Sequence, residues 1–338
     1  APGGFAQDNN SGSAYVVLGG RDGEDGLLML DDPAVEYGLR LQGRPGFGSG
    51  DVLGTGVDIA GDTDGDGLAE VIAGAPYAEG PFPQDNRGYV YVVSGAPGLG
   101  GTLAAESFGP ADGRFFEGGS NGNYAGFAVS KAGDVDGDGL ADLLIGSYRS
   151  GFFDGQAWLV QGDGPARLNL GTLDGTAGVR MPGPMPGWQE QLGDSVSDAG
   201  DLNGDGYGDI VVGGRTDSDP PLEGRGRSYV LFGAEDGLAA LAARDGSPGV
   251  IDLDLVGPGE GFRIDGAAPF DEAGRAVSGA GDVNGDGLDD LLIGAPLADR
   301  PAAIGAEPDA GAAYLLFGGA GIDGRGPLDL AAPDDGVV

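Results

Sequence analysis

The chain has 338 residues and contains neither cysteine nor histidine. This composition excludes disulfide bonds, thiolate or imidazole catalysis, haem ligation and ordinary zinc sites. The 54 acidic residues outnumber the 17 basic residues and give a net charge of -37, which argues against electrostatic binding of nucleic acid or of an anionic membrane. No apolar run approaches the length of about 20 residues that inserts into a bilayer as a helix, so we expect no direct membrane insertion.

The first predicted element is a strand with an aromatic residue at its centre, in the pattern Gly-x-x-(Tyr/Trp)-(Val/Leu)-(Val/Leu)-x-Gly. The pattern occurs five times, at residues 12–19, 88–95, 155–162, 226–233 and 311–318, with Tyr15, Tyr91, Trp158, Tyr229 and Tyr314 as the aromatic residues. Because these rings hold a fixed place on an apolar strand, we expect them to pack between neighbouring sheets.

From residue 48 onward a longer unit repeats. A strand of small residues comes first, as in 126–130 and 274–278, and an acidic nine-residue loop follows it. The next strand is a continuous apolar run, which predicts burial of both its faces. After a variable loop comes the aromatic strand, and a weaker strand such as 261–266 closes the unit. The apolar runs span residues 70–73, 142–145, 209–212 and 290–293.

One unit covers roughly 70 residues, enough for four short strands and their loops. No segment shows sustained helical periodicity, so the fold class is all-β. Four-stranded units of this kind pack radially as the blades of a β-propeller, and each sheet then lies between two neighbours. A linear β-solenoid is the alternative, but its period would be much shorter.

The acidic loop follows the pattern Asp-x-(Asp/Asn)-Gly-Asp-Gly-x-x-(Asp/Glu) and starts at Asp62, Asp134, Asp201 and Asp282. Side-chain oxygens at positions 1, 3, 5 and 9 can converge on one hard cation if the loop curls tightly. The glycines permit that curl, and the carbonyl of position 7 can add another oxygen. A set with many oxygens and no nitrogen or sulfur favours calcium, and we expect about four such sites.

The chain resembles the FG-GAP repeat, which forms the blades of the integrin α-subunit propeller. The name motif is present as Phe47-Gly48 and Gly74-Ala75-Pro76, and its second half recurs as Gly294-Ala295-Pro296. Gly146-Ser147 and Gly213-Gly214 depart from it. The resemblance covers nearly the whole chain and implies blades of four strands that bind calcium through the acidic loop.

The resemblance assigns the ligands residue by residue. The side-chain ligands are Asp62, Asp64, Asp66 and Glu70; Asp134, Asp136, Asp138 and Asp142; Asp201, Asn203, Asp205 and Asp209; and Asp282, Asn284, Asp286 and Asp290. The backbone carbonyls come from Leu68, Leu140, Tyr207 and Leu288. Because Glu70 is one methylene longer than aspartate, we expect the first site to be looser or differently shaped.

The domain prediction is a single propeller over residues 1–338. It comprises an N-terminal half-blade at 1–47 and repeats at 48–120, 121–187, 188–266 and 267–338, which makes about five blades. The terminal blade is either closed by strand exchange or incomplete. An incomplete blade exposes strand edges that attract other strands. Residues 327–330 are a candidate strand for donation to a neighbouring copy or a host protein.

The predicted function is that of a secreted, calcium-binding and calcium-stabilised module for adhesion, protein binding or surface assembly. The expected location is secreted or at the cell surface. A start at Ala1-Pro2 agrees with a mature chain after signal-peptide removal, and it agrees equally with a chain cut at an arbitrary boundary. A structural subunit of a larger extracellular filament or envelope complex is the alternative. A propeller-based lyase or hydrolase is a weaker alternative, because no acid pair stands apart from the repeat. No catalytic residue is assigned.

Partner contacts are expected from the variable loops and from one tryptophan. Variable loops on one rim of a propeller commonly carry recognition. Trp188 lies in a Gly/Pro-rich segment outside the aromatic register. The loops span residues 77–87, 148–154, 215–225 and 297–310.

Overall fold

The computed structural model describes residues 10–17, 38–44, 50–80, 85–149, 154–183, 190–215, 224–242, 244, 246–299 and 307–332. Phe47-Gly48 and Trp188 lie outside these ranges, as does part of each of the four variable loops. Among the described residues the only α-helix is the four-residue α1 (Ala239–Ala242). The all-β prediction is therefore confirmed.

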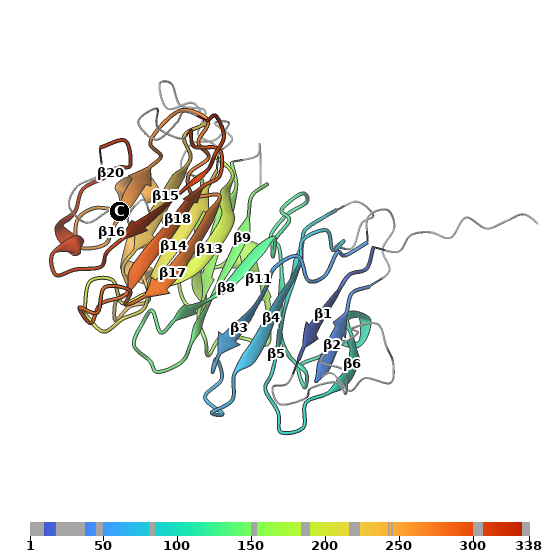
Figure 1. Cartoon of the computed structure of the whole chain (residues 1–338). Coiled ribbons are helices and arrows are strands. Elements are labelled where there is room, and N and C mark those ends of the chain that lie inside the picture. The colour runs from blue at the N-terminus through green and yellow to red at the C-terminus, as the bar shows by residue number, and fades with distance from the viewer. Residues whose placement is uncertain are drawn as a thin grey trace, which may run out of the picture.

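The described strands form five sheets that follow one another along the chain (Figure 1). The first holds β1 (Ser13–Val16), β2 (Leu39–Gln42) and β6 (Gly101–Ala104). The second holds β3 (Val57–Gly61), β4 (Glu70–Ala75), β5 (Tyr89–Val93), β7 (Gly113–Glu117) and β11 (Arg167–Asn169). The third holds β8 (Ala128–Gly133), β9 (Asp142–Ser147), β10 (Gln156–Val160) and β12 (Gly178–Pro182).

The fourth sheet holds β13 (Leu192–Gly200), β14 (Asp209–Gly214), β15 (Arg227–Leu231), β16 (Gly261–Asp265) and β20 (Leu328–Asp329). The fifth holds β17 (Ala276–Gly281), β18 (Asp290–Ala295) and β19 (Ala312–Leu316). Short 3-10 turns follow the aromatic strand in four units, at Ala105–Ser107, Leu170–Thr172, Leu253–Leu255 and Ile322–Gly324.

The order of strands within a unit agrees with the sequence. In sheets two to five the small-residue strand pairs with the apolar strand, and the apolar strand pairs with the aromatic strand, always antiparallel. Every residue of β9 and β10 is buried, which confirms that these apolar strands are covered on both faces. Hydrophobic side chains of neighbouring sheets share clusters, for example Ile72 of β4 with Leu143 and Ile145 of β9.

The first strands of successive sheets lie beside one another, β3 next to β8, β8 next to β13 and β13 next to β17. Glycine allows this close approach. A Cβ atom added at Gly74 would lie 1.9 Å from the carbonyl oxygen of Gly126 in the next unit, and one at Gly146 would lie 2.3 Å from that of Gly193. Small residues therefore hold the sheets together near the common axis, and the arrangement fits a β-propeller.

The sheets also exchange strands in a way that the sequence did not predict. β6 pairs parallel with β2, β11 with β7, and β20 with β16, so that a segment of one unit extends the sheet of the unit before it. An isolated parallel bridge between Arg180 and Val250 continues the series. Residues 327–330, expected as a strand for another molecule, thus pair with the fourth sheet of their own chain.

Candidate metal centres

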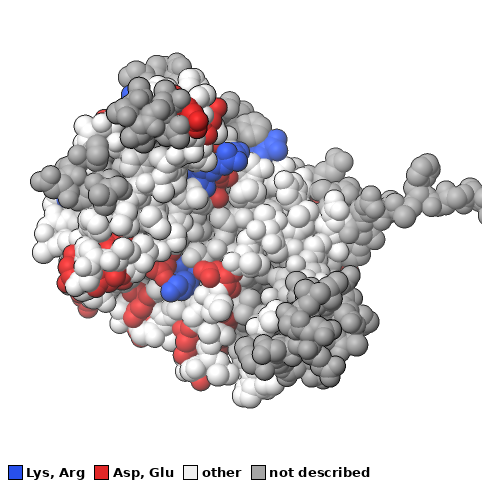
Figure 2. All heavy atoms as spheres, viewed as in Figure 1, with Lys and Arg blue, Asp and Glu red and all other residues white. Residues whose placement is uncertain are grey.

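The four acidic loops join the first and second strands of sheets two to five and lie on the same side of these sheets. Figure 2 shows acidic side chains gathered along this lower edge of the molecule. The neighbouring surface in this view carries few basic groups.

Each loop curls around the carboxylate at its first position. In the first loop, Asp62 accepts hydrogen bonds from the backbone N–H of Gly65 at 2.8 Å and of Gly67 at 2.9 Å. Asp201 and Asp282 accept bonds from the same two loop positions. The glycines at positions 4 and 6 have positive φ in every loop, from 76° to 93°, which is why residues with a Cβ atom fit poorly there.

The curl brings carboxylates together. Asp62, Asp64 and Glu70 each place an oxygen within 4.8 Å of the others, and so do Asp134, Asp136 and Asp138. In the second loop Asp134 uses Oδ2 to accept the Gly139 N–H at 3.0 Å, while its Oδ1 is buried without a hydrogen-bond partner among the described residues. A buried carboxylate oxygen without a donor fits a site for a cation.

The third and fourth loops carry asparagine at position 3 and arrange it alike. The Oδ1 of Asn203 accepts the Asp205 N–H at 2.9 Å, and its Nδ2 donates to Asp205 Oδ2 at 2.8 Å. Asn284 repeats both bonds with Asp286. The amide therefore keeps the oxygen geometry of the loop while it removes one negative charge.

The acid at position 9 differs from the rest because it is buried in all four loops. Its two oxygens accept backbone N–H groups from two places, the second position of its own loop and the glycine that ends the aromatic strand. Asp209, for example, accepts from Leu202 at 2.8 Å and from Gly233 at 3.0 Å. Glu70, Asp142 and Asp290 make the equivalent pairs of bonds. This residue thus connects the loop to the third strand.

Burial raises the pKa of two of the position-9 acids. Desolvation raises the pKa of Asp142 to about 7, although the N–H groups of Gly162 and Val135 act in the opposite direction. The pKa of Asp209 is also raised to about 7 by desolvation. Desolvation likewise raises the pKa of Asp136, and the neighbouring charges of Asp138 and Asp134 add to the shift. Crowded, partly dehydrated carboxylates of this kind favour a neutralising cation.

Consecutive loops also contact one another. The position-8 N–H of one loop donates to the position-1 carbonyl of the loop before it: Ala141 to Asp62 at 2.8 Å, Gly208 to Asp134 at 2.8 Å and Asp289 to Asp201 at 3.2 Å. The position-7 side chain lies over the position-4 glycine of that preceding loop, as Tyr207 lies over Gly137. Sequence reasoning missed this coupling, and its only signal was the recurrence of a bulky residue at position 7 of all four loops.

A second polar feature is a cavity of about 580 Å³ between the first strands β3, β8, β13 and β17. Its lining includes Lys131, the only lysine in the chain, whose Nζ lies 2.8 Å from Asp198 Oδ2. That hydrogen bond is the main cause of a raised pKa of Lys131. Asp58 accepts the Ser130 hydroxyl at 3.1 Å, and Asp289 accepts the Asp201 N–H at 2.8 Å. Asp58, Asp198 and Asp289 therefore have partners within the fold, whereas Asp134, which also lines the cavity, has the unpartnered Oδ1 described above.

The aromatic residues of the third strands lie as predicted where they are buried. Tyr91, Trp158 and Tyr229 are exposed by no more than 2% and pack between sheets, whereas Tyr15 and Tyr314 are half-buried.

None of the described helices has both the length and the apolar character that crossing a bilayer requires.

Comparison with known proteins agrees with this architecture. The FG-GAP repeat family matches residues 53–93, 125–160 and 273–316. Integrin alpha-PS2 of Drosophila melanogaster is 32% identical over 188 residues, which is 53% of this chain and 12% of that protein. Integrin alpha-IIb of Mus musculus is 30% identical over 253 residues, which is 70% of this chain and 21% of that protein.

A third relative has an enzyme name. The phosphatidylinositol-glycan-specific phospholipase D of Bos taurus is 38% identical over 130 residues, or 38% of this chain and 13% of that protein. The chain spans less than a quarter of the length of each of these three relatives. With its repeated loops, its matching strands and these similarities, the chain is an FG-GAP repeat protein that resembles the integrin alpha subunits.

Proposed function

We propose that this chain is a calcium-stabilised β-propeller module that acts outside the cell by binding protein. The observation that supports calcium most directly is the second loop, where three carboxylates converge and the buried Asp134 Oδ1 has no partner among the described residues. Oxygen ligands in a flexible loop are the set that Ca²⁺ prefers. Bound calcium would neutralise these carboxylates and fix the curl of each loop.

Each loop would supply the carboxylate or amide oxygens of positions 1, 3, 5 and 9 and the carbonyl of position 7. The position-9 acids would serve twice, since an oxygen that accepts one N–H retains a second lone pair. Glu70 lies in the same carboxylate group as Asp62 and Asp64, so its longer side chain still reaches the first loop. The proposed ligand set is the one given above for loops 62–70, 134–142, 201–209 and 282–290.

The experiment is a calcium titration by calorimetry combined with thermal unfolding in calcium and in EGTA. We expect about four equivalents of calcium and a melting temperature that falls in EGTA, because uncompensated carboxylates then repel one another. Asp134→Asn should weaken binding at one site and lower the melting temperature in calcium. Glu106→Gln, an exposed acid away from the loops, is the matched control and should leave both unchanged. Equal melting temperatures in calcium and EGTA would contradict the proposal.

Protein binding outside the cell is supported by the relatives named as integrin alpha subunits and by the acidic surface, which favours a basic partner over nucleic acid. A non-enzymatic role is supported by the central cavity, where Asp198, Asp58 and Asp289 are engaged by Lys131, Ser130 and a backbone N–H. The carboxylate oxygen of this cavity that has no partner among the described residues belongs to the proposed calcium ligand Asp134. We further propose one propeller over residues 1–338 with about five blades, divided at the repeat boundaries given above.

A second candidate, a subunit that assembles with copies of itself, is favoured by two exposed apolar patches, called end faces here: the outer side of the fifth sheet, and the part of β3 in the second sheet that the described strands of the first sheet leave exposed. Leu292 of the fifth sheet is 40% exposed, while its counterparts Leu144 and Val211 are fully buried against the following sheet. Val57 of the second sheet is 56% exposed, while its counterpart Val129 is 8% exposed. The corresponding positions are covered at the internal junctions between sheets, so one patch could pack on the other in a second copy.

A further inference from the structure

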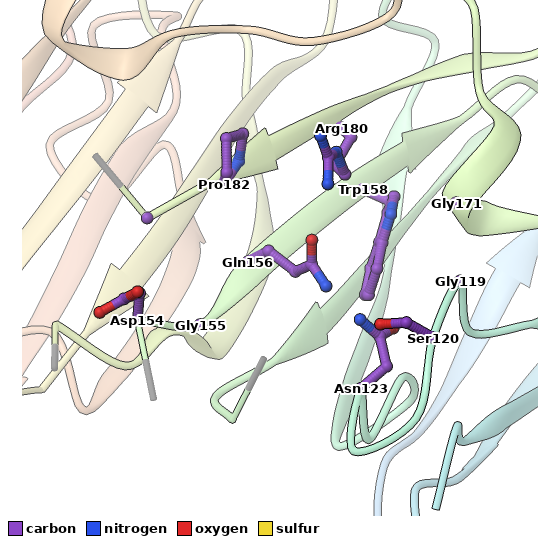
Figure 3. A pocket seen from close by; sticks show the side chains of 11 residues that line it. Gly119, Ser120, Asn123, Asp154, Gly155, Gln156, Trp158, Gly171, Arg180 and Pro182 are labelled. Atoms are coloured by element: carbon purple, nitrogen blue, oxygen red, sulfur yellow. The ribbon is translucent and has the colours of Figure 1, made fainter. Parts of the chain in front are cut away.

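A cavity of about 380 Å³ lies between the second and third sheets, away from the acidic loops (Figure 3). Asn123 and Ser120 approach it from the segment before β8, and Gln156 and Trp158 come from β10. Arg180 of β12 and Asp154 add charged groups to the lining, and glycines form much of the rest. A site of this size is in the usual range for a small ligand.

Strand register explains why these side chains meet. Trp158 stands opposite Arg180, and Gln156 stands opposite Pro182. Alternate residues of paired strands point to the same face, so all four side chains face the second sheet. In Figure 3 Gln156, Asn123 and Arg180 surround the indole of Trp158.

Two buried polar atoms at this cavity have no hydrogen-bond partner among the described residues. They are the indole Nε1 of Trp158, a residue that is 1% exposed, and Oδ1 of Asn123, a residue that is 4% exposed. One is a donor and the other is an acceptor. Arg180 forms no ion pair with any described acid. Buried polar groups are costly when unpaired, and their presence beside a cavity indicates a ligand.

The equivalent junction of the next unit shows what is missing here. There Glu190, Arg227, Tyr229 and Asp265 occupy the places of Asn123, Gln156, Trp158 and Pro182. Arg227 bonds Glu190 at 3.0 Å and Asp265 at 2.8 Å, and the Tyr229 hydroxyl donates to Glu190 at 3.2 Å. Those side chains form a network of hydrogen bonds with one another, centred on Glu190 Oε1 and Arg227. In the third sheet neutral residues stand at the three charged positions: Asn123 in place of Glu190, Gln156 in place of Arg227 and Pro182 in place of Asp265. The hydrogen-bonded network is therefore absent there.

We propose that this cavity binds one pyranose residue of a carbohydrate. A sugar hydroxyl can accept from the indole N–H while its neighbour donates to Asn123 Oδ1, since each hydroxyl is both donor and acceptor. The amide of Gln156 and the guanidinium of Arg180 suit further hydroxyls on the same ring. The sugar ring itself would lie against the glycine walls of the cavity.

The test is saturation-transfer NMR with methyl glycosides of glucose, galactose, mannose and N-acetylglucosamine, each titrated to millimolar concentration in calcium buffer. We expect at least one glycoside to bind saturably. Trp158→Phe, which removes the N–H donor together with the pyrrole ring, and Asn123→Leu, which removes the amide acceptor, should each weaken binding on the order of tenfold. Tyr91→Phe, at the equivalent place of the second sheet, is the matched control and should bind as the parent does.

Melting temperatures of the variants separate loss of binding from loss of folding. No saturable glycoside signal, or an affinity unchanged in both Trp158→Phe and Asn123→Leu, overturns the proposal. Saturable binding of a serine-containing peptide in place of every glycoside overturns the sugar assignment. Asp205→Asn, which changes a proposed calcium ligand in another loop, should leave glycoside affinity unchanged, so this inference can fail or hold independently of the calcium proposal.

Discussion

The first and last acids of each loop meet different physical demands. Asp201 is half-buried and accepts only loop N–H groups, so its task is to shape the loop. Asp209 is fully buried and joins the loop to Gly233, 24 residues further along the chain. A hydroxyl or an amide offers fewer acceptor sites than a carboxylate, which explains why an acid is used where two N–H groups need partners.

We expect Asp209→Ala to destabilise the protein by about 2 kcal/mol, because the N–H groups of Leu202 and Gly233 would remain buried without acceptors. The dehydration that raises the pKa of Asp209 offsets part of this loss. The measurement is urea unfolding in EGTA, so that calcium binding does not contribute. Asp205→Asn is the control, because position 5 is exposed. The free energy of unfolding of this variant in EGTA should stay within about 0.5 kcal/mol of that of the parent. Equal stability of the two variants would show that position 9 has no structural role.

The sequence allowed the positions of these acids to be predicted, but not their partners. Spacing alone placed Asp209 at the ninth position of its loop. Its bond to Gly233 depends on the antiparallel register that sets Ile210 opposite Leu231, and such a register is a tertiary property. The glycine that ends each aromatic strand was visible as a repeat, although nothing in the sequence indicated that its N–H meets an acid.

At the scale of loops and strands, the molecule is linked unit to unit in two places. On one side the acidic loops are joined by backbone hydrogen bonds and by a side chain over a glycine. At the outer edge a short parallel strand of one unit pairs with the sheet before it. Both links join neighbouring units only. A substitution that disrupts one unit should therefore destabilise the adjacent unit before more distant ones.

Two glycine substitutions separate backbone strain from the contact between loops. Gly137→Ala and Gly285→Ala both place a Cβ atom at a positive φ, 76° and 80°, which costs about 1–2 kcal/mol in each. The new Cβ at Gly137 would lie 2.6 Å from Cε1 of Tyr207, whereas at Gly285 nothing lies within 4 Å. We therefore expect Gly137→Ala to lose a further 1–2 kcal/mol, roughly, through overpacking.

Chemical denaturation in calcium measures both glycine variants. The adjacent loop offers a second readout, because displacement of Tyr207 should change its fluorescence or its NMR signal in Gly137→Ala alone. If the two variants lose the same stability, the contact between loops contributes nothing and strain explains both losses.

The strands that carry the repeat were predictable, whereas the strands that join the units were not. β9 and β10 can be recognised in the sequence as apolar runs that lie between glycines. β11 and β20 have three and two residues, too few for a periodic pattern, and their partners lie 52 and 64 residues away in the sequence. Such pairing is determined by how the units pack, which a pattern within one unit does not contain.

At the scale of the whole molecule, the negative net charge and the exposed apolar end faces have opposite effects on the association of copies. A net charge of -37 opposes association of copies, and four bound calcium ions would reduce its magnitude by eight. The exposed Val57 and Leu292 favour association, because each internal junction buries the corresponding residues. Calcium should therefore shift the balance toward contact between the end faces.

We expect the molar mass measured by light scattering to rise with protein concentration in calcium and to return toward the monomer in EGTA. Leu292→Glu and Val57→Glu should each abolish the rise, because a charge on either face cannot be buried in the contact without a partner. Leu255→Glu is the matched control: Leu255 is 47% exposed but lies on a 3-10 turn outside both end faces, and assembly should persist. A parent protein that stays monomeric in calcium at every concentration would exclude self-assembly through these faces and leave them as surfaces for a different protein.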